Sequence, residues 1–180
     1  MFFIPGFVIT LATFPGIIVH ELAHQLFCRI YKVPVFKVVY FQTGNPAGYV
    51  LHETPLNEWH SVMISIGPFF VNTIIGAIIA LPAALPIFKF HTGTPIDYLL
   101  IYLGVSIAMH AFPSRGDADA IWQTLKKNTT RLWVKVLGYP LIGLIYVGSI
   151  GSFFWLDLLY GVGVAIGLPK LIIYIISNFY

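Results

Sequence analysis

The sequence predicts an all-α multi-pass membrane protein of four to five transmembrane helices, with a small β-hairpin and a short interfacial helix on the cytoplasmic side. Three observations predict this class. Hydrophobic residues make up 58% of the chain and charged residues only 9%, whereas soluble domains carry roughly 25% charged residues. Several intervals without charge approach the length of a bilayer-spanning helix, about 20 residues. Finally, most of the lysines and arginines fall on one side of these intervals.

The intervals that predict spans are apolar and free, or nearly free, of charged side chains. They cover residues 59–88, 98–114, 136–156 and 158–180, and the last interval is interrupted only by Lys170. Residues 1–20 also lack charge, but Pro5, Pro15 and Gly16 divide them, so the number of spans at this end is left open. We expect the first secure helix at about 15–31, because proline is well tolerated in the first turn.

The basic residues predict the orientation of the chain. If the spans alternate, eight of the ten lysines and arginines lie on one side: Arg29, Lys32, Lys37, Arg115, Lys126, Lys127, Arg131 and Lys135. Lys89 lies on the other side. The positive-inside rule therefore places the connections 32–56 and 113–131 in the cytoplasm of a cell-membrane protein.

Two segments on this side are not predicted to cross the membrane. Residues 33–51 are rich in β-branched and aromatic side chains and contain the turn sequence Gly44-Asn45-Pro46-Ala47-Gly48, which is typical of a β-hairpin. The second segment, 117–127, carries Ala118, Ile121, Trp122 and Leu125 at helical spacing. With an acid at its start and lysines at its end, it predicts a short helix lying in the interface.

The sequence His20-Glu21-Leu22-Ala23-His24 is the candidate functional motif. Successive residues of a helix turn by about 100°, so His20 and His24 lie ~40° apart on one face and can bind one metal ion. Glu21 lies beside that face, where it can act on water next to the metal rather than bind the metal itself. The pattern therefore predicts a zinc site with Glu21 as the general base.

The surroundings of the motif favour function over chance. It is flanked by Phe14 to Val19 and by Leu26-Phe27, so its helix is predicted to be in the membrane. Ionisable residues in lipid are costly and are usually functional. The alternative is a structural polar cluster. Arg29 marks the end of the helix, ~7 Å beyond His24 and ~13 Å beyond His20, so the metal would lie in the bilayer within reach of cytoplasmic water.

A catalytic zinc site usually has three protein ligands, so a third must come from elsewhere in the chain. Asp117 is the first candidate, because it follows the 98–114 interval on the same side of the membrane. Asp119 is the second, and Glu53, His52 and His110 remain alternatives. Asp117 has another interpretation, since Ser114 and Asp117 have the spacing of a helix capping box.

With these residues in place, the chain resembles the site-2 protease family of intramembrane zinc metallopeptidases from about 15 to 127. The resemblance rests on the His20–His24 motif in an apolar helix, on Gly67-Pro68 followed by Asn72, and on a proline-containing segment that ends in an aspartate. It implies that His20, His24 and Asp117 bind one Zn²⁺, that Glu21 is the general base, and that Asn72 helps to hold substrate.

The chain differs from the family pattern in two places. Three residues separate Pro68 from Asn72 where the family has two, and Phe112-Pro113-Ser114 stands where the family has a longer Asn-Pro and Leu-Asp-Gly signature. The role of Asn72 and the choice of Asp117 over Asp119 therefore stay open, and the role of His110 is open as well. Asn72 either contacts substrate or hydrogen bonds a neighbouring helix, and His110 either supports the metal site or caps its own helix.

The predicted function is an intramembrane zinc metalloprotease that hydrolyses peptide bonds in or near transmembrane segments. Its expected partners are the lipid bilayer and a transmembrane protein or peptide, not nucleic acid, and its oligomeric state is undetermined. Residues 1–180 are predicted to form one domain, with a core at about 15–127 and two further membrane helices in 131–180.

The alternative is a non-catalytic, degenerate metal-binding membrane protein or a small metal transporter. A transporter needs ionisable residues in several spans. The two last spans offer only Asp157 and Lys170, which argues against transport.

Overall fold

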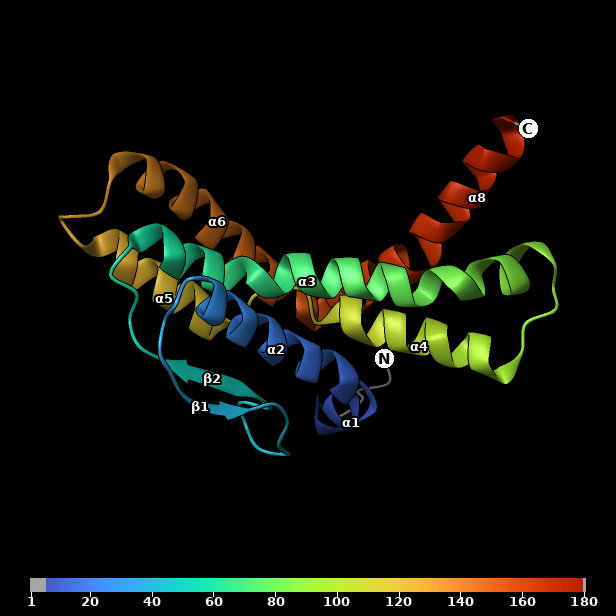
Figure 1. The fold of residues 1–180 in the computed structure, drawn as a ribbon, viewed down its shortest axis with the longest axis horizontal. Coiled ribbons are helices and arrows are strands. Elements are labelled where there is room, and N and C mark those ends of the chain that lie inside the picture. The colour runs from blue at the N-terminus through green and yellow to red at the C-terminus, as the bar shows by residue number, and fades with distance from the viewer. Residues whose placement is uncertain (1–5, 180) are drawn as a thin grey trace.

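The computed structural model describes residues 6–179, which form a helical bundle with one two-stranded sheet (Figure 1). The α-helices are α1 (Gly6–Ala12), α2 (Phe14–Ile30), α3 (Glu58–Ala84), α4 (Pro95–Met109), α5 (Arg115–Lys126), α6 (Leu132–Gly151), α7 (Leu156–Val162) and α8 (Leu168–Phe179). Shorter π and 3₁₀ turns, η1 (Leu85–Lys89), η2 (Ser152–Phe154) and η3 (Gly163–Gly167), extend or join them. The strands are β1 (Val35–Val39) and β2 (Tyr49–His52).

Three helical segments are long and apolar enough to cross a membrane. They are Glu58–Lys89, Leu132–Gly151 and Leu156–Asn178, and a fourth span results if α1 and α2, which meet at 76°, count as one. The length and apolar composition of these segments agree with the expected membrane character.

The interval 98–114 is only partly helical, because α4 ends at Met109 and residues 110–114 form a connection. At 1.5 Å per residue, the 15 residues of α4 extend ~22 Å, less than a bilayer core. Pro113 has no backbone N–H, so it cannot donate the i→i−4 hydrogen bond to the Met109 carbonyl that a further helical turn would require.

Helices α3 and α4 form the centre of the bundle and run side by side in opposite directions (Figure 1). Small residues allow their backbones to approach closely. A Cβ added at Gly76 would lie 2.8 Å from the carbonyl oxygen of Gly104 and 2.9 Å from Cβ of Ala108. Close packing through small residues is typical of helix pairs in membranes, where the hydrophobic effect does not drive association.

Helix α2 packs against both helices of this pair. Pro15 occupies its first turn, as predicted for a helix at about 15–31. Gly67 of α3 allows the ring of Phe27 to lie against the α3 backbone, since an added Cβ would meet that ring at 2.5 Å. At the other end of α2, the Gly16 N–H donates to the Ser106 hydroxyl of α4 at 3.2 Å. Helix α2 is thereby held along its length.

The predicted hairpin is confirmed. Strands β1 and β2 are antiparallel, with Val39 opposite Tyr49 and Val38 opposite Val50. Residues 40–48 connect them without regular secondary structure, in agreement with the turn sequence. Both strands contact α2, so the hairpin lies beside the helix that carries the histidine motif (Figure 1).

Helix α5 has the predicted amphipathic pattern, but its apolar face is used inside the protein. Ala118, Ile121 and Leu125 are fully buried and pack in one cluster with Val62 of α3 and Val134 of α6. Trp122, the fourth member of the predicted stripe, is 39% exposed. The helix therefore joins α3 to α6, and its placement in a membrane interface stays a prediction.

The last span packs most closely on the bundle through its first half, and α8 keeps a few contacts, such as the hydrogen bond from Lys89 Nζ to the Ser177 hydroxyl at 3.0 Å. Gly161 of α7 lies against α4, where an added Cβ would meet the Val105 carbonyl oxygen at 2.7 Å. Helix α8 points away from the other helices (Figure 1) and exposes apolar side chains such as Leu171 and Tyr174. Such exposure suits a helix surrounded by lipid.

Replacing Gly76 with valine should destabilise the protein, because the new side chain meets backbone and Cβ atoms of α4. Overpacking of this kind costs about 1–3 kcal/mol. Thermal unfolding in detergent, followed by circular dichroism, should show a lower midpoint for Gly76→Val. Gly143→Val is the control, since nothing lies within 4 Å of a Cβ at Gly143. Equal midpoints for the two variants would contradict the close packing of α3 on α4.

Candidate metal centre

Helix α2 brings the histidine motif into the interior of the bundle. His20 is 8% exposed, Glu21 7% and His24 7%. One turn of helix separates the two histidines, so their rings lie on the same face, with centroids 4.8 Å apart. The local geometry is the one that helical periodicity predicts.

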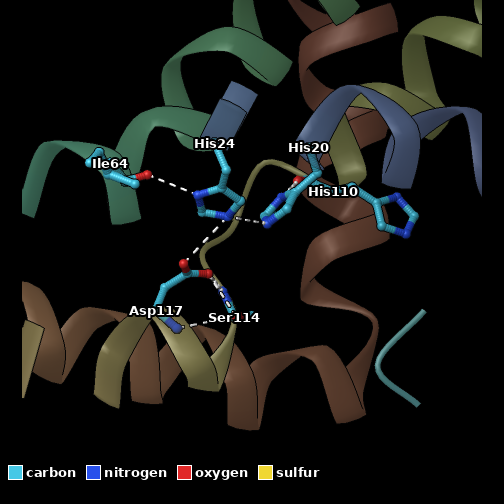
Figure 2. A network of polar contacts seen from close by, with 6 residues as sticks. All are labelled: His20, His24, Ile64, His110, Ser114 and Asp117. Carbon is cyan, nitrogen blue, oxygen red and sulfur yellow. Dashed lines mark hydrogen bonds and ion pairs between the residues drawn. The ribbon is translucent and has the colours of Figure 1, made fainter. Parts of the chain in front are cut away.

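Backbone carbonyl groups fix the orientation of both imidazole rings. Nδ1 of His20 lies 2.7 Å from the carbonyl oxygen of His110, and Nδ1 of His24 lies 2.9 Å from that of Ile64 (Figure 2). A carbonyl oxygen only accepts hydrogen bonds, so Nδ1 must carry the proton in each ring. In the neutral rings, both Nε2 atoms are therefore left with a lone pair, the form that binds metal ions.

Three ligand atoms converge at this point (Figure 2). The Nε2 atoms of His20 and His24 are 3.1 Å apart, and Oδ1 of Asp117 lies 3.3 Å from Nε2 of His24. The three ligand atoms lie within 4.8 Å of one another. Two imidazole lone pairs and a carboxylate oxygen repel one another in a dry interior unless positive charge lies between them. Two histidines and one carboxylate are a ligand set that zinc uses in peptidases.

Asp117 takes part in both the helix cap and the candidate metal cluster, through a different carboxylate oxygen in each case. Its Oδ2 accepts hydrogen bonds from the backbone N–H of Ser114 at 2.7 Å and from the Ser114 hydroxyl at 2.6 Å, which forms a capping box at the start of α5. Its Oδ1 faces His24. The cap therefore orients the carboxylate and leaves one oxygen for the cluster.

The electrostatics at Asp117 favour the ionised carboxylate. Burial by itself raises the pKa of Asp117, but before a metal ion binds, the positive charge of a protonated His24 outweighs this effect and the pKa of Asp117 falls to about 2. An ionised carboxylate is the form that coordinates a cation.

Asn72 supports the histidine cluster through the His110 carbonyl group. This side chain of α3 is fully buried, and its Nδ2 group donates to the carbonyl oxygens of Gly16, Ile107 and His110 at 3.1–3.2 Å. The His110 carbonyl is the same group that accepts from His20. Asn72 thus hydrogen bonds neighbouring helices, which is one of the two roles that the sequence allowed. Its Oδ1 is buried with no hydrogen-bond partner among residues 6–179, and substrate contact by Asn72 stays a prediction.

His110 contributes to the cluster through its backbone and not through its ring. The ring points away from His20 and His24 (Figure 2). Its Nδ1 lies 2.9 Å from the Ser106 carbonyl oxygen, and its Nε2 lies 3.5 Å from the Thr13 hydroxyl. Sequence reasoning singled out His110 for its imidazole and missed the carbonyls of His110 and Ile64, because every residue has a carbonyl and none carries a sequence signal.

Glu21 lies between the cluster and the hairpin connection. A Cβ added at Gly48 would be 2.7 Å from Cγ and 2.9 Å from Oε1 of Glu21. Only a residue without a side chain leaves this space to the carboxylate. The backbone next to β2 therefore covers Glu21 on the side of the hairpin.

The other candidate ligands do not join the cluster. Asp119 and Glu53 are exposed. Nδ1 of His52 lies 2.8 Å from the carbonyl oxygen of Glu53, at the end of the hairpin. Among residues 6–179, His20, His24 and Asp117 are the group whose ligand atoms can hold a metal ion.

Replacing Asp117 with asparagine should weaken zinc binding at least tenfold, since changes in residues that merely support a ligand already cost about 10–100-fold. Asp119→Asn is the matched control, because it makes the same change on the same helix at an exposed position. Zinc content after dialysis against graded chelator measures the difference. Loss of zinc from Asp119→Asn and not from Asp117→Asn would overturn the assignment.

The comparisons with known proteins agree with this chemistry. A family model described as "Putative zincin peptidase" matches residues 13–132, which is more than half of the 180-residue chain and includes α2 to α5. No curated protein and no solved structure matches the chain. The matched region contains His20, Glu21, His24 and Asp117. The chain therefore belongs to this zincin peptidase family, a family of zinc metallopeptidases.

Proposed function

We propose that this protein is an intramembrane zinc metallopeptidase of the site-2 protease type, which cleaves peptide bonds in or near transmembrane segments of other proteins. One observation carries the proposal. His20 and His24 lie on α2, which forms a bent apolar pair with α1, and the His24 ring bonds the Ile64 carbonyl of α3, which belongs to the span-length apolar segment Glu58–Lys89. A hydrolytic site at this place meets substrates that reach it through the membrane.

The side chains divide the chemistry between binding and proton transfer. His20, His24 and Asp117 would hold zinc, which would lower the pKa of the attacking water and polarise the scissile carbonyl. Glu21, next to His20 on the same helix, accepts a proton from the attacking water on its carboxylate. It then delivers this proton to the nitrogen of the leaving amine. The backbone near Gly48 limits access of bulk water to this carboxylate.

A transmembrane helix hides its peptide bonds, so a substrate must be extended locally before it is cut. The two-stranded sheet has an outer edge on each strand, next to α2. An edge of this kind binds an extended peptide by strand addition, with its main-chain groups paired in the absence of water. We propose that the hairpin holds the unwound segment beside Glu21.

We also propose that the site opens to the cytoplasm of a cell-membrane protein. The connection between α5 and α6 carries Lys127 and Arg131 at one end of the bundle, and the connection that begins at Lys89 lies at the opposite end (Figure 1). The excess of basic residues at the first end is what the positive-inside rule expects of the cytoplasmic side.

Replacing Glu21 with glutamine should leave zinc bound and abolish cleavage, because an amide keeps the size of the carboxylate and cannot accept the proton. General base catalysis contributes about 10²–10⁴-fold, so the rate should fall at least 100-fold. Cleavage of a co-expressed single-span protein, read by immunoblot together with zinc content, measures both. Glu58→Gln, at the start of α3, is the control. Undiminished cleavage by Glu21→Gln would refute the proposed mechanism.

Gly48→Val should also impair cleavage while leaving zinc bound. The valine side chain would displace the carboxylate of Glu21, and a misplacement of about 1 Å can cost about 100-fold in rate. Gly44→Val makes the same change in the same connection, where an added Cβ would lie 3.5 Å from Nε2 of the flexible Gln42 side chain. Equal rates for the two variants would mean that the Gly48 backbone does not position Glu21.

A further inference from the structure

A second feature of the molecule is an apolar cavity of about 410 Å³ between α3, α6 and the connection 110–114. Its volume is within the range of pockets that bind small ligands, about 300–1,000 Å³. Its walls include Phe69 of α3, Phe112 and Pro113 of the connection, and Gly148 of α6. Residues beyond 132 lie outside the matched family region, so α6 adds this cavity to the part of the chain that holds the metal centre.

The cavity and the metal centre share one short piece of chain. Phe112 lies midway between His110, whose carbonyl orients His20, and Ser114, which orients Asp117. Two residues of extended chain reach at most ~7 Å, so the Cα atom of Phe112 is within that distance of the Cα atoms of both residues. A side chain bound here belongs to a peptide that passes close to the metal ligands.

The aromatic wall of the cavity is fixed in place. The rings of Phe112 and Tyr160 have centroids 5.0 Å apart in an edge-to-face arrangement, and Phe69 contacts both. The Tyr160 hydroxyl lies 2.7 Å from that of Thr73 in α3, a hydrogen bond in which either group can donate. A rigid aromatic surface of this kind favours a flat or branched apolar side chain.

The cavity opens sideways, toward the lipid. Ile145 and Gly148 are buried at its floor, whereas Phe70, Leu144 and Val147 at its rim are exposed. Because α3 and α6 are span-length apolar helices, this opening faces the direction from which a transmembrane substrate arrives.

A hydrogen-bond donor lies beside the cavity, because Arg115 is two residues beyond the cavity residue Pro113. Nε of Arg115 donates to the Ser149 hydroxyl at 3.0 Å, and Ser149 follows the cavity residue Gly148. The guanidinium has five N–H donors, so others remain for an incoming acceptor. An unwound peptide in lipid exposes carbonyl oxygens that need donors, whereas an acyl chain has none to offer. The pairing of donor and cavity favours a peptide as the occupant.

We propose that this cavity binds a large apolar side chain of the substrate, close to the bond that is cleaved, and so determines which transmembrane segments are cut. The inference rests on the proposed peptidase function and adds a specificity site to it. Phe112 and Gly148 are the specificity-determining residues. Phe112 provides the wall shared with the metal centre, and Gly148 leaves the cavity open.

Gly148 gives the sharpest test. A Cβ at this position would contact the Phe112 ring at 3.4 Å, so a longer side chain would fill the cavity, whereas Gly143 on the same helix faces open space. The probes are synthetic single-span peptides of leucine and alanine that carry phenylalanine or alanine at each central position in turn. For wild type we expect one position at which phenylalanine raises kcat/KM by at least about tenfold over alanine, as apolar pockets discriminate.

Gly148→Leu should reduce this preference to nearly onefold, and Gly143→Leu should retain it. A preference that survives Gly148→Leu, or that is lost equally in both variants, would overturn the proposal. Cleavage by wild type that depends on Glu21, with no position preferring phenylalanine, would also overturn it and would leave the peptidase function intact. If wild type cleaves none of the peptides and no co-expressed protein, the peptidase function itself fails.

Binding can be measured without cleavage. A probe peptide with a photoreactive phenylalanine, bound to Glu21→Gln protein, should crosslink to Phe69, Phe112 or another cavity residue. Gly148→Leu introduced into the same protein should reduce this crosslinking at least about tenfold, and Gly143→Leu should not. Labelling of the cavity by a photoreactive phospholipid that excess peptide does not displace would identify a lipid chain as the occupant and overturn the proposal.

Discussion

The metal centre depends on the two hydrogen bonds that the histidine rings make to backbone carbonyls. These bonds run from Nδ1 of His20 to the His110 carbonyl and from Nδ1 of His24 to the Ile64 carbonyl. They keep the proton of each neutral ring on Nδ1 and direct Nε2 toward the cluster. The carbonyl groups belong to α3 and to the end of α4, so the site exists only when α2 is packed against both helices. The capped carboxylate of Asp117 completes the group from a fourth helix, α5.

Close backbone approach is what makes this arrangement possible in an apolar bundle. Gly16 and Gly67 allow α2 to lie against α4 and α3, and Gly76 and Gly104 allow α3 to lie against α4. Asn72 then connects α2 to the end of α4 through three hydrogen bonds. Ionisable groups placed in such an interior are costly unless they are paired or bind a cation, so packing and ligand chemistry are coupled. The same connection that supports the site, residues 110–114, also forms a wall of the apolar cavity.

Charge-free intervals predicted the long helices well, and strand composition with a turn sequence predicted the hairpin, because these elements depend on residues that are near one another in the chain. Helices α2, α3 and α6 and the hairpin lie close to their expected positions. The interval 98–114 was expected to be one span, and the structure ends α4 at Met109. The absence of charge shows that a segment prefers an apolar environment, but it does not show whether its backbone is helical. It therefore could not locate the end of α4. The amphipathic stripe of α5 was recognised, but periodicity does not reveal whether lipid or protein covers an apolar face.

The sequence by itself determined the pairing of His20 with His24, the place of Glu21 beside them, and the cap that links Ser114 to Asp117, since each is a relation within one turn of helix. Only the tertiary structure decided that Asp117, and not Asp119, faces His24. It also decided which carbonyls orient the rings and that Gly48 lies against Glu21. These contacts join segments far apart in the chain through groups that every residue possesses. Their positions follow from helix packing, so no pattern of neighbouring residues in the sequence indicates them.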